Sequence, residues 1–113
     1  MRIVTRDDAE VVPVDDAMTI YQYFSEVESP QASLVTADLD GLHSRRMNRR
    51  SVKLYFVLSG KLLVKSDEME REVGPLAGVL IEPGTWVELV GEAAQIAIVY
   101  SPAFDPADET IDE

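Results

Sequence analysis

The sequence predicts a single all-β domain folded as a sandwich or closed barrel. Apolar and β-branched runs of strand length recur from residue 18 onward, and turn residues separate them at short intervals. No segment has the apolar periodicity of a long helix. At 113 residues the chain is long enough for one hydrophobic core and too short for two. We therefore expect one barrel rather than several domains.

The chain divides into a lead-in, a barrel and a tail. Residues 1–17 form an acidic lead-in, in which Glu10–Val14 is predicted to be a short strand. Residues 18–104 are predicted to form the barrel, and the acidic residues 105–113 to form a flexible tail. Phe104 is an aromatic residue between two prolines. We expect it to pack on the barrel just before the tail begins.

The predicted strands of the barrel are apolar or alternating segments of five to eight residues. They are Met18–Phe24, Ala32–Leu39, Val52–Leu58, Lys61–Lys65, Glu68–Val73, Leu76–Glu82, Thr85–Val90 and Ala94–Tyr100. The third and fourth flank Ser59-Gly60, a pair that is typical of a hairpin turn. Gly74-Pro75 and Pro83-Gly84 separate later strands in the same way.

The composition excludes several classes of function. Ten basic residues against twenty-one acidic residues give a net charge of −11, which argues against a nucleic-acid or anionic-membrane partner. The absence of cysteine excludes disulfides, thiolate metal ligands and a cysteine nucleophile. The chain has no long apolar run and no secretory signal. We therefore expect a soluble cytoplasmic protein with no membrane partner.

Two segments that contain a strand and a glycine turn resemble a known family. Tyr55–Gly60 and Ile81–Trp86 are similar to the two sequence motifs of the cupins. The opening Ile3–Ala9, Asn48 and the ending Ser101–Pro106 resemble those of small single-domain cupins. The resemblance implies a cupin-type double-stranded β-helix, which is a jelly-roll barrel.

The residues that hold a metal in many cupins are replaced here. The family motifs carry two histidines and a glutamate ahead of the first glycine turn, and a third histidine after the second. The corresponding positions carry, in order, Arg46 or Met47, Asn48 or Arg49, Lys53, and Val87. A divalent metal needs three or four imidazole, carboxylate or thiolate donors at one point. We therefore predict a metal-free cupin without a cofactor.

Strand alternation predicts which residues line the barrel. If Lys53 takes the inward position that the resemblance implies, Tyr55 and Val57 lie beside it in the interior. The outer face of the same strand then carries Leu54, Phe56 and Leu58. The other residues expected inside are Val87, Leu89 and, in one register of the last strand, Gln95, Ala97 and Val99. This lining is mostly apolar with a few polar groups, as in many small-molecule sites.

An inward lysine has more than one interpretation. The Lys53 ammonium can bind a carboxylate or phosphate, act as a base, or form a Schiff base if burial lowers its pKa. Alternatively, Lys53 pairs with an acid such as Glu88, or extends its charge to the barrel mouth. The hydroxyls of Tyr55 and Tyr100 can orient a ligand or donate a proton, although tyrosines also serve as ordinary core residues.

These considerations give a set of candidate site residues. The candidate catalytic residues are Lys53, Tyr55 and His43. The candidate ligand-binding residues are Asn48, Arg49, Val57, Val87, Leu89 and Tyr100. His43, the only histidine, lies in Asp40–Ser44, which is predicted to be a surface loop; the alternative is that it carries a proton in catalysis.

Four arginines lie within six residues, and we call Arg45, Arg46, Arg49 and Arg50 the arginine cluster. One interpretation is a rim that recruits an anionic ligand. Another is that the arginines neutralise the acidic ends of the chain or of a partner subunit. A nucleic-acid surface is disfavoured, because the cluster is short and the protein is strongly acidic.

The sequence leaves three classes of function open. The first is a metal-independent isomerase, epimerase, cyclase or lyase that acts on a small anionic or carbonyl-bearing metabolite. The second is a ligand-sensing module, and the third is a structural dimerisation module. Alternation turns Trp86 and Glu88 away from the interior, so Trp86 is expected between sheets or at a subunit interface. Apolar positions such as Leu54, Phe56 and Ile81 are expected to need cover, which predicts a homodimer.

Overall fold

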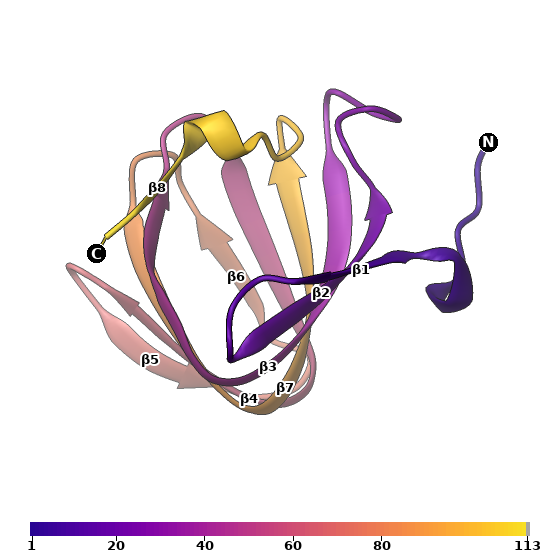
Figure 1. Ribbon diagram of the computed structural model, residues 1–113. Helices are drawn as coiled ribbons and strands as arrows, with labels where there is room; N and C mark the ends of the chain where they lie inside the picture. The colour runs from indigo at the N-terminus through magenta and orange to yellow at the C-terminus, as the bar shows by residue number, and fades with distance from the viewer. Residues whose placement is uncertain (113) are drawn as a thin grey trace.

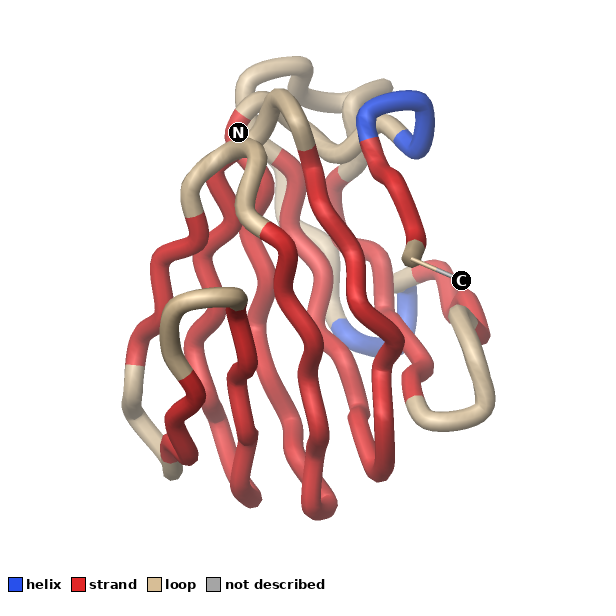
Figure 2. The backbone as a smooth tube through the Cα atoms, turned by 90° about the vertical axis from the view of Figure 1, so that its left-hand side faces the viewer, coloured by secondary structure: helices blue, strands red, loops and turns tan. Residues whose placement is uncertain are grey.

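The computed structural model describes residues 1–112, which form eight strands and two short 3₁₀ helices. The elements are η1 (Arg6–Asp8), β1 (Glu10–Pro13), β2 (Met18–Phe24), β3 (Ser33–Asn48), β4 (Val52–Ser66), β5 (Glu70–Val73), β6 (Gly78–Ile81), β7 (Trp86–Ser101), η2 (Pro106–Asp108) and β8 (Glu109–Ile111). Neither helix in this part of the chain is long and apolar enough to cross a membrane. The predicted all-β class is confirmed, and Figure 2 shows strands along most of the backbone.

Three long strands, β3, β4 and β7, form the centre of one antiparallel sheet that folds over on itself. In one half of the barrel β1, β2 and β6 extend this centre, and in the other half β5 and β8 do so. Figure 1 shows the long strands curving through the bottom of the view, so that the two halves face each other. This is the predicted jelly-roll arrangement.

Glycines make the folding of the long strands possible. Gly60 in β4 has φ +77°, and a Cβ atom there would lie 2.3 Å from the carbonyl oxygen of Ala93. Gly91 in β7 lies equally close to the backbone of Leu39, since its Cβ would be 2.4 Å from the Leu39 oxygen. Strand β4 also shifts register around Ser59 as it passes from one half to the other.

The predicted hairpin at Ser59-Gly60 is wrong. Residues on both sides of this pair belong to β4, and both halves of β4 pair with β7 rather than with each other. A positive-φ glycine serves equally well in a turn and in a strand bend, so the local sequence does not distinguish them. The predicted strands 85–90 and 94–100 are also halves of one strand, β7. Strand β6 is limited to Gly78–Ile81 within the predicted 76–82 segment.

Strand β3 continues much further than the sequence predicted. Instead of ending at Leu39 it runs to Asn48, so that segment 40–48 pairs with β7 and is not a loop. His43 and part of the arginine cluster therefore lie on a strand. The sequence did not predict this part of β3, because segment 40–48 carries polar side chains on both faces and lacks the alternation of apolar and polar residues that is typical of a strand.

The core lies between the two halves, and it fixes the facing of each strand. The most deeply buried apolar side chains include Val57, Leu62 and Ile96, each 0% exposed. Lys53, Tyr55 and Val57 face inward as predicted, whereas Leu54, Phe56 and Leu58 are exposed. Ile81, predicted among the exposed apolar positions, is buried.

The facing predicted for the last strand is wrong. In the 94–100 half of β7 the buried residues are Ala94, Ile96 and Ile98, while Gln95 is exposed and Ala97 and Val99 lie on its side of the strand. Apolar residues occupy consecutive positions in this strand, so alternation alone does not choose between the two registers. The correct register places Tyr100 on the inner side.

Both ends of the chain contain regular structure. Strand β1 pairs with β2, which confirms the predicted N-terminal strand within one residue. At the other end, η2 and β8 occupy most of the segment predicted to be flexible, and β8 pairs with Arg46–Asn48 of β3. Asp105 begins η2 by accepting a hydrogen bond from the backbone nitrogen of Ala107. Phe104 packs edge-on against Tyr100, with ring centroids 5.0 Å apart.

Candidate functional site

The barrel contains a cavity of about 330 Å³ that draws residues from both halves of the sheet. Its apolar lining consists of Val12, Val14, Met18, Ile20, Phe24, Val35, Leu89, Ile98 and Phe104. Its polar lining consists of Gln22, Ser25, Ser33, His43, Arg46, Tyr55, Tyr100 and Glu109. A cavity of this size with a few polar groups suits a small organic molecule.

His43 is held in one orientation by Asp15. The Nδ1 atom of His43 lies 2.7 Å from Oδ2 of Asp15, and the His43 side chain is 13% exposed. Asp15 is itself fixed, because its Oδ1 accepts hydrogen bonds from the backbone nitrogens of Ala17 and Met18. With the carboxylate accepting from Nδ1–H, the neutral ring carries its free lone pair on Nε2. Nε2 has no hydrogen-bond partner among residues 1–112.

The surroundings keep His43 neutral. Burial lowers the pKa of His43, the hydrogen bond to Asp15 acts in the opposite direction, and the charge of Arg46 lowers the pKa further. Although burial raises the pKa of Asp15, the hydrogen bonds from His43 and the backbone outweigh it, and the pKa of Asp15 is lowered. The pair is therefore an ionised carboxylate beside a neutral imidazole at neutral pH. This arrangement suits a general base.

Arg46 enters the cavity from the same strand as His43. The register of β3 against β7 shifts between these two residues, and the shift brings side chains three positions apart to the same cavity. One Arg46 guanidinium nitrogen lies 3.6 Å from Asp15 Oδ2. Its Nε atom is buried without a hydrogen-bond partner in the described part of the chain. Arg46 itself lines the cavity, so its guanidinium brings a positive charge to the wall beside His43.

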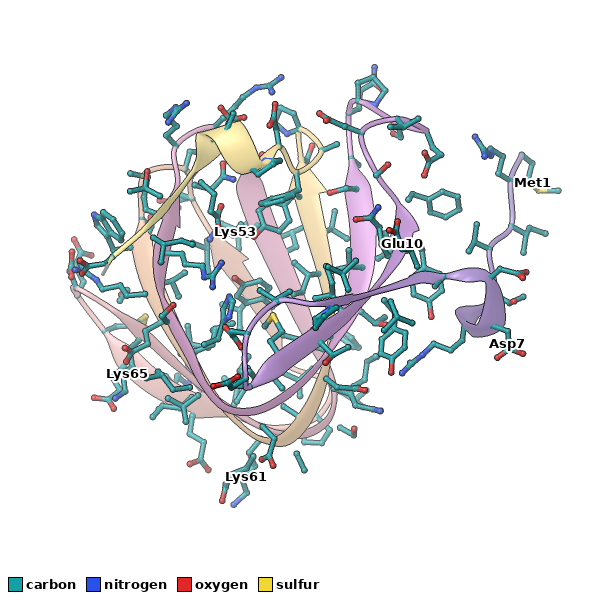
Figure 3. The ribbon with its side chains drawn as sticks, in the orientation of Figure 1. Met1, Asp7, Glu10, Lys53, Lys61 and Lys65 are labelled. Atoms are coloured by element: carbon teal, nitrogen blue, oxygen red, sulfur yellow. The ribbon has the colours of Figure 1, made fainter. Side chains whose placement is uncertain are left out.

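Lys53 lies behind the cavity wall and is 2% exposed. Its Nζ is 3.9 Å from Oε1 of Glu109, whose Oε2 accepts a 2.9 Å hydrogen bond from Asn48 Nδ2. Burial lowers the pKa of Lys53, and the nearby Glu109 charge partly offsets the effect. Figure 3 shows Lys53 inside the barrel, in contrast to Lys61 and Lys65, which point outward. The alternative partner considered for Lys53, Glu88, instead pairs with Lys65.

Two tyrosine hydroxyls face the same cavity. Burial raises the pKa of both Tyr55 and Tyr100, and the charge of Glu109 adds to the effect on each. Both hydroxyls therefore stay protonated throughout the physiological range. Neither hydroxyl has a hydrogen-bond partner within residues 1–112, which leaves both available as donors to a ligand.

Comparison with solved structures identifies the fold. Pac13, described as a nucleoside dehydratase, shares 20% sequence identity, and the superposition covers 100% of this chain and 92% of that one with a TM-score of 0.89. KdgF from Halomonas sp. shares 16% identity over 91% of this chain and 96% of that one, with a TM-score of 0.80. The protein has the cupin fold. No family model and no curated protein matches the chain.

Two further comparisons bear on this cupin fold. Structures of Streptomyces Pac13 variants with a single histidine or tyrosine substituted contain uridine, and the histidine variant matches with a TM-score of 0.86 at 20% identity, over 96% of this chain and 88% of that one. The polyketide cyclase RemF from Streptomyces resistomycificus shares 17% identity over 90% of this chain and 80% of that one, with a TM-score of 0.76. At these identities the similarity establishes the fold alone.

The cupin barrel gathers some of the predicted site residues and not others. His43, Tyr55, Leu89 and Tyr100 line the cavity, and Lys53 lies directly behind it. The remaining predicted residues do not line it. Val57 and Val87 belong to the core, Asn48 is fully buried and supports Glu109, and Arg49 is exposed and pairs with Asp108.

Three residues of the site were not predicted. Asp15 is one of several acids in the lead-in, and no local signal distinguishes it from its neighbours. Glu109 lies in the segment predicted to be flexible. Arg46 was noted only as part of the arginine cluster and as a replaced metal-ligand position, and its inward facing depends on the register shift in β3. Pairing between segments that are distant in the sequence brings all three to the site, so local sequence patterns could not predict them.

The polar side chains near His43 do not form a metal site. Within residues 1–112, no group of three or more histidine, aspartate or glutamate side chains is arranged to hold a metal ion. Asp15 and His43 do approach each other, but the third polar group beside them is the Arg46 guanidinium, which repels a cation. The residues at this point therefore do not fit a divalent metal.

Proposed function

We propose that this protein is a lyase or cyclase that removes a proton next to a carbonyl group of a small metabolite, with His43 as the general base. The observation that carries the proposal is the 2.7 Å contact between Asp15 and His43 at the cavity wall. A carboxylate on Nδ1 fixes the tautomer whose Nε2 accepts a proton, and it stabilises the imidazolium that results. Asp15 orients His43, whereas His43 contacts the substrate.

The other polar residues have complementary roles in this proposal. When His43 Nε2 removes the proton from carbon, negative charge develops on the carbonyl oxygen. The Arg46 guanidinium and the hydroxyls of Tyr55 and Tyr100 belong to residues that line the cavity, and they supply the donors that stabilise that charge. In a dehydration the resulting enolate forms a carbon–carbon double bond and expels the β-hydroxyl, which leaves as water after it receives a proton from the His43 imidazolium. The catalyst then returns to its starting protonation state.

The charges around the cavity favour a carbonyl-bearing substrate over an anionic one. Each cation near the cavity has an acid beside it: Arg46 has Asp15, and Lys53 has Glu109. A phosphate or carboxylate would therefore enter a site whose positive charges are already balanced. The apolar wall contributes contact area for the rest of the molecule. We propose that the reaction uses no metal ion, because the donor set beside His43 does not fit one.

The comparisons support this class of chemistry without identifying the substrate. Pac13 is described as a nucleoside dehydratase and RemF as a polyketide cyclase. Dehydration and cyclisation of a carbonyl compound share one step, the removal of a proton next to the carbonyl. Uridine, which the Pac13 variants contain, is a suitable first binding probe for this protein.

The test is hydrogen exchange on a panel of β-hydroxy carbonyl compounds in deuterated water. We expect the protein to exchange the proton next to the carbonyl of at least one compound, to retain this activity after chelator treatment, and to lose it in His43→Gln. Lys61→Met is the matched control, because Lys61 is exposed on the outside of the barrel and pairs only with Glu72 in this part of the chain. Exchange that persists in His43→Gln would refute the role of His43, and exchange that stops with the chelator would refute the metal-free reaction.

A ligand-sensing module is the second candidate function. The apolar wall and the unpaired donors suit ligand binding as well as they suit catalysis. If uridine or a panel compound binds with micromolar affinity but no compound is exchanged or converted, the module interpretation replaces the enzyme. The third interpretation, a structural module, requires a filled barrel and fits the cavity poorly.

We further propose that two copies of this chain associate through the outer face of the half-barrel that contains β6. One cross-strand row on this face is entirely apolar, with Leu34 beside Val99, Val99 beside Leu54, and Leu54 beside Leu80. Leu54 and Leu80 are 42% and 60% exposed. An uncharged row of side chains is the part of a strongly acidic protein on which two copies meet with least repulsion.

A further inference from the structure

Three pairs of opposite charges join the C-terminal segment to β3 and to the turn that follows β3. We call residues 105–112 the strap. Asp108 of the strap lies 3.5 Å from both Arg49 and Arg50, and Asp112 lies 3.0 Å from Arg45. Arg45 also contacts Asp67, in the turn between β4 and β5. The exposed members of the arginine cluster thus contact acids rather than the cavity.

Backbone hydrogen bonds join the strap to the same residues. The backbone nitrogen of Arg49 donates to the Asp108 oxygen, and that of Asp112 donates to the Arg45 oxygen. Strand β8 pairs with β3 over three residues only. Figure 1 shows η2 above the open end of the barrel and β8 descending along its side.

Apolar packing contributes little to holding the strap. None of residues 105–112 falls in the buried class, and the apolar Ile111 is 45% exposed. Exposed ion pairs are weak and are screened by salt. A segment held by few backbone bonds and exposed charges belongs to the least stable part of a protein, the part that opens locally.

The strap nevertheless supplies part of the cavity wall. Glu109, whose side chain is 9% exposed, lines the cavity and lies beside Lys53. Detaching the strap removes this carboxylate and uncovers Lys53 and Asn48. Closure therefore restores a charge balance inside the barrel, and opening exposes the site from this side.

We propose that the strap opens and closes one wall of the cavity, and that the ion pairs between the arginine cluster and Asp108 and Asp112 set how long it stays closed. This deepens the proposed function by assigning a route into its site. Strap opening is measurable without any substrate, so failure of this proposal is distinguishable from failure of the proposed chemistry.

The first test is amide hydrogen exchange of the full chain at low and high salt. We expect amides 109–112 to exchange about tenfold faster in high salt, while the central strand β7 is unchanged. In the double variant Asp108→Asn/Asp112→Asn, the same amides should exchange fast already at low salt, and their exchange rate should no longer depend on salt. The matched control is Glu70→Gln/Glu72→Gln, which removes two carboxylates that pair with Lys65 and Lys61 at the opposite edge of the same half-barrel. Equal protection of the strap in both double variants would overturn the proposal.

The second test locks the strap. Because the chain has no cysteine, Met47→Cys/Thr110→Cys introduces the only two thiols, at directly opposite positions of β3 and β8. The probe is diethyl pyrocarbonate, whose reaction with His43, the only histidine, is followed by peptide mass. We expect the oxidised form to react severalfold more slowly than the reduced form. Leu63→Cys/Glu72→Cys, a pair of opposite residues in β4 and β5, is the control and should show no difference. Equal rates in the locked and unlocked strap would refute a route through this wall.

Discussion

Asp15 Oδ2 lies 2.7 Å from Nδ1 of His43, although 28 positions separate the two residues in the chain. Asp15 follows β1 and His43 lies midway along β3, so the contact exists only in the folded barrel. The contact places an ionised carboxylate beside a neutral imidazole, and the imidazole belongs to a residue that lines the cavity. These are the elements of a general base whose orientation is fixed.

Asp15→Asn should reduce proton abstraction at least about tenfold with little change in fold. The asparagine oxygen can still accept from the backbone of Ala17 and Met18, but the amide nitrogen next to His43 favours the tautomer whose Nε2 is protonated. The measurement is deuterium exchange on an active panel compound. Asp16→Asn, an exposed neighbour, is the control. Full activity in Asp15→Asn would contradict the orienting role.

The stability of the protein should decrease as the pH falls below 6.5, the ordinary pKa of histidine. Burial lowers the pKa of His43 in the folded state, so between this lowered pKa and 6.5 the unfolded chain binds more protons than the folded one. The free energy of unfolding therefore rises with pH through this window. Above the window, the contribution of neutral His43 to this free energy is complete. Urea unfolding at a series of pH values should show this slope in the natural sequence and a flatter curve in His43→Gln. An unchanged slope would contradict the assignment to His43.

Lys53 and Glu109 should be strongly coupled in a double-mutant cycle. Lys53→Met and Glu109→Gln each leave a buried or half-buried charge without its partner, and each should cost about 1–3 kcal/mol. The double variant should cost less than the two single variants together, because it removes both charges. Urea unfolding measures the three free energies. Additive effects would show that the 3.9 Å contact carries no energy.

The single variant Lys53→Met also distinguishes the two function classes, because loss of turnover with ligand binding retained favours an enzyme over a binding module.

Gly60→Ala should destabilise the barrel by at least about 2 kcal/mol. The added Cβ would lie 2.3 Å from the Ala93 oxygen at a residue with φ +77°. Gly74→Ala is the control, because nothing lies within 4 Å of a Cβ at that position and its φ is not positive. Thermal unfolding of the two variants should therefore differ clearly. Similar melting temperatures would contradict the close approach of β4 and β7 at this bend.

Leu54→Glu/Phe56→Glu should convert the expected dimer into a monomer. Both residues are exposed on the proposed interface, and two added charges per copy repel across a symmetric contact. Light scattering after size-exclusion chromatography gives the mass directly. The control is Ile3→Glu/Met69→Glu, which adds the same charge at exposed apolar positions outside this face. A monomeric natural protein at micromolar concentration, or a control that also dissociates, would contradict the assignment.

Part of the site could be predicted from local pattern. The alternation in Val52–Leu58 put Lys53 and Tyr55 on one face, and the resemblance to the cupins implied that this face is the inner one, as the burial of alternate residues in β4 shows. The facing of β7 was predicted wrongly because apolar residues occupy both of its faces. The predicted loop around His43 was wrong because polar residues can also pair as a strand when a neighbouring strand, here β7, supplies the hydrogen bonds.

The sequence by itself determined the all-β class, since that depends on the spacing of apolar and turn residues, and its resemblance to the cupins implied the jelly-roll architecture and the inward lysine of β4. Only the tertiary structure decided which acidic side chain contacts which basic side chain. Asp15, His43 and Arg46 meet because β3 shifts register, and Glu109 reaches Lys53 because β8 pairs with β3. The sequence shows which residues are acids and which are bases. The length and register of the strands decide how close an acid and a base lie in the fold. The candidate chemistry of this cupin therefore depends on long-range pairing rather than on any motif.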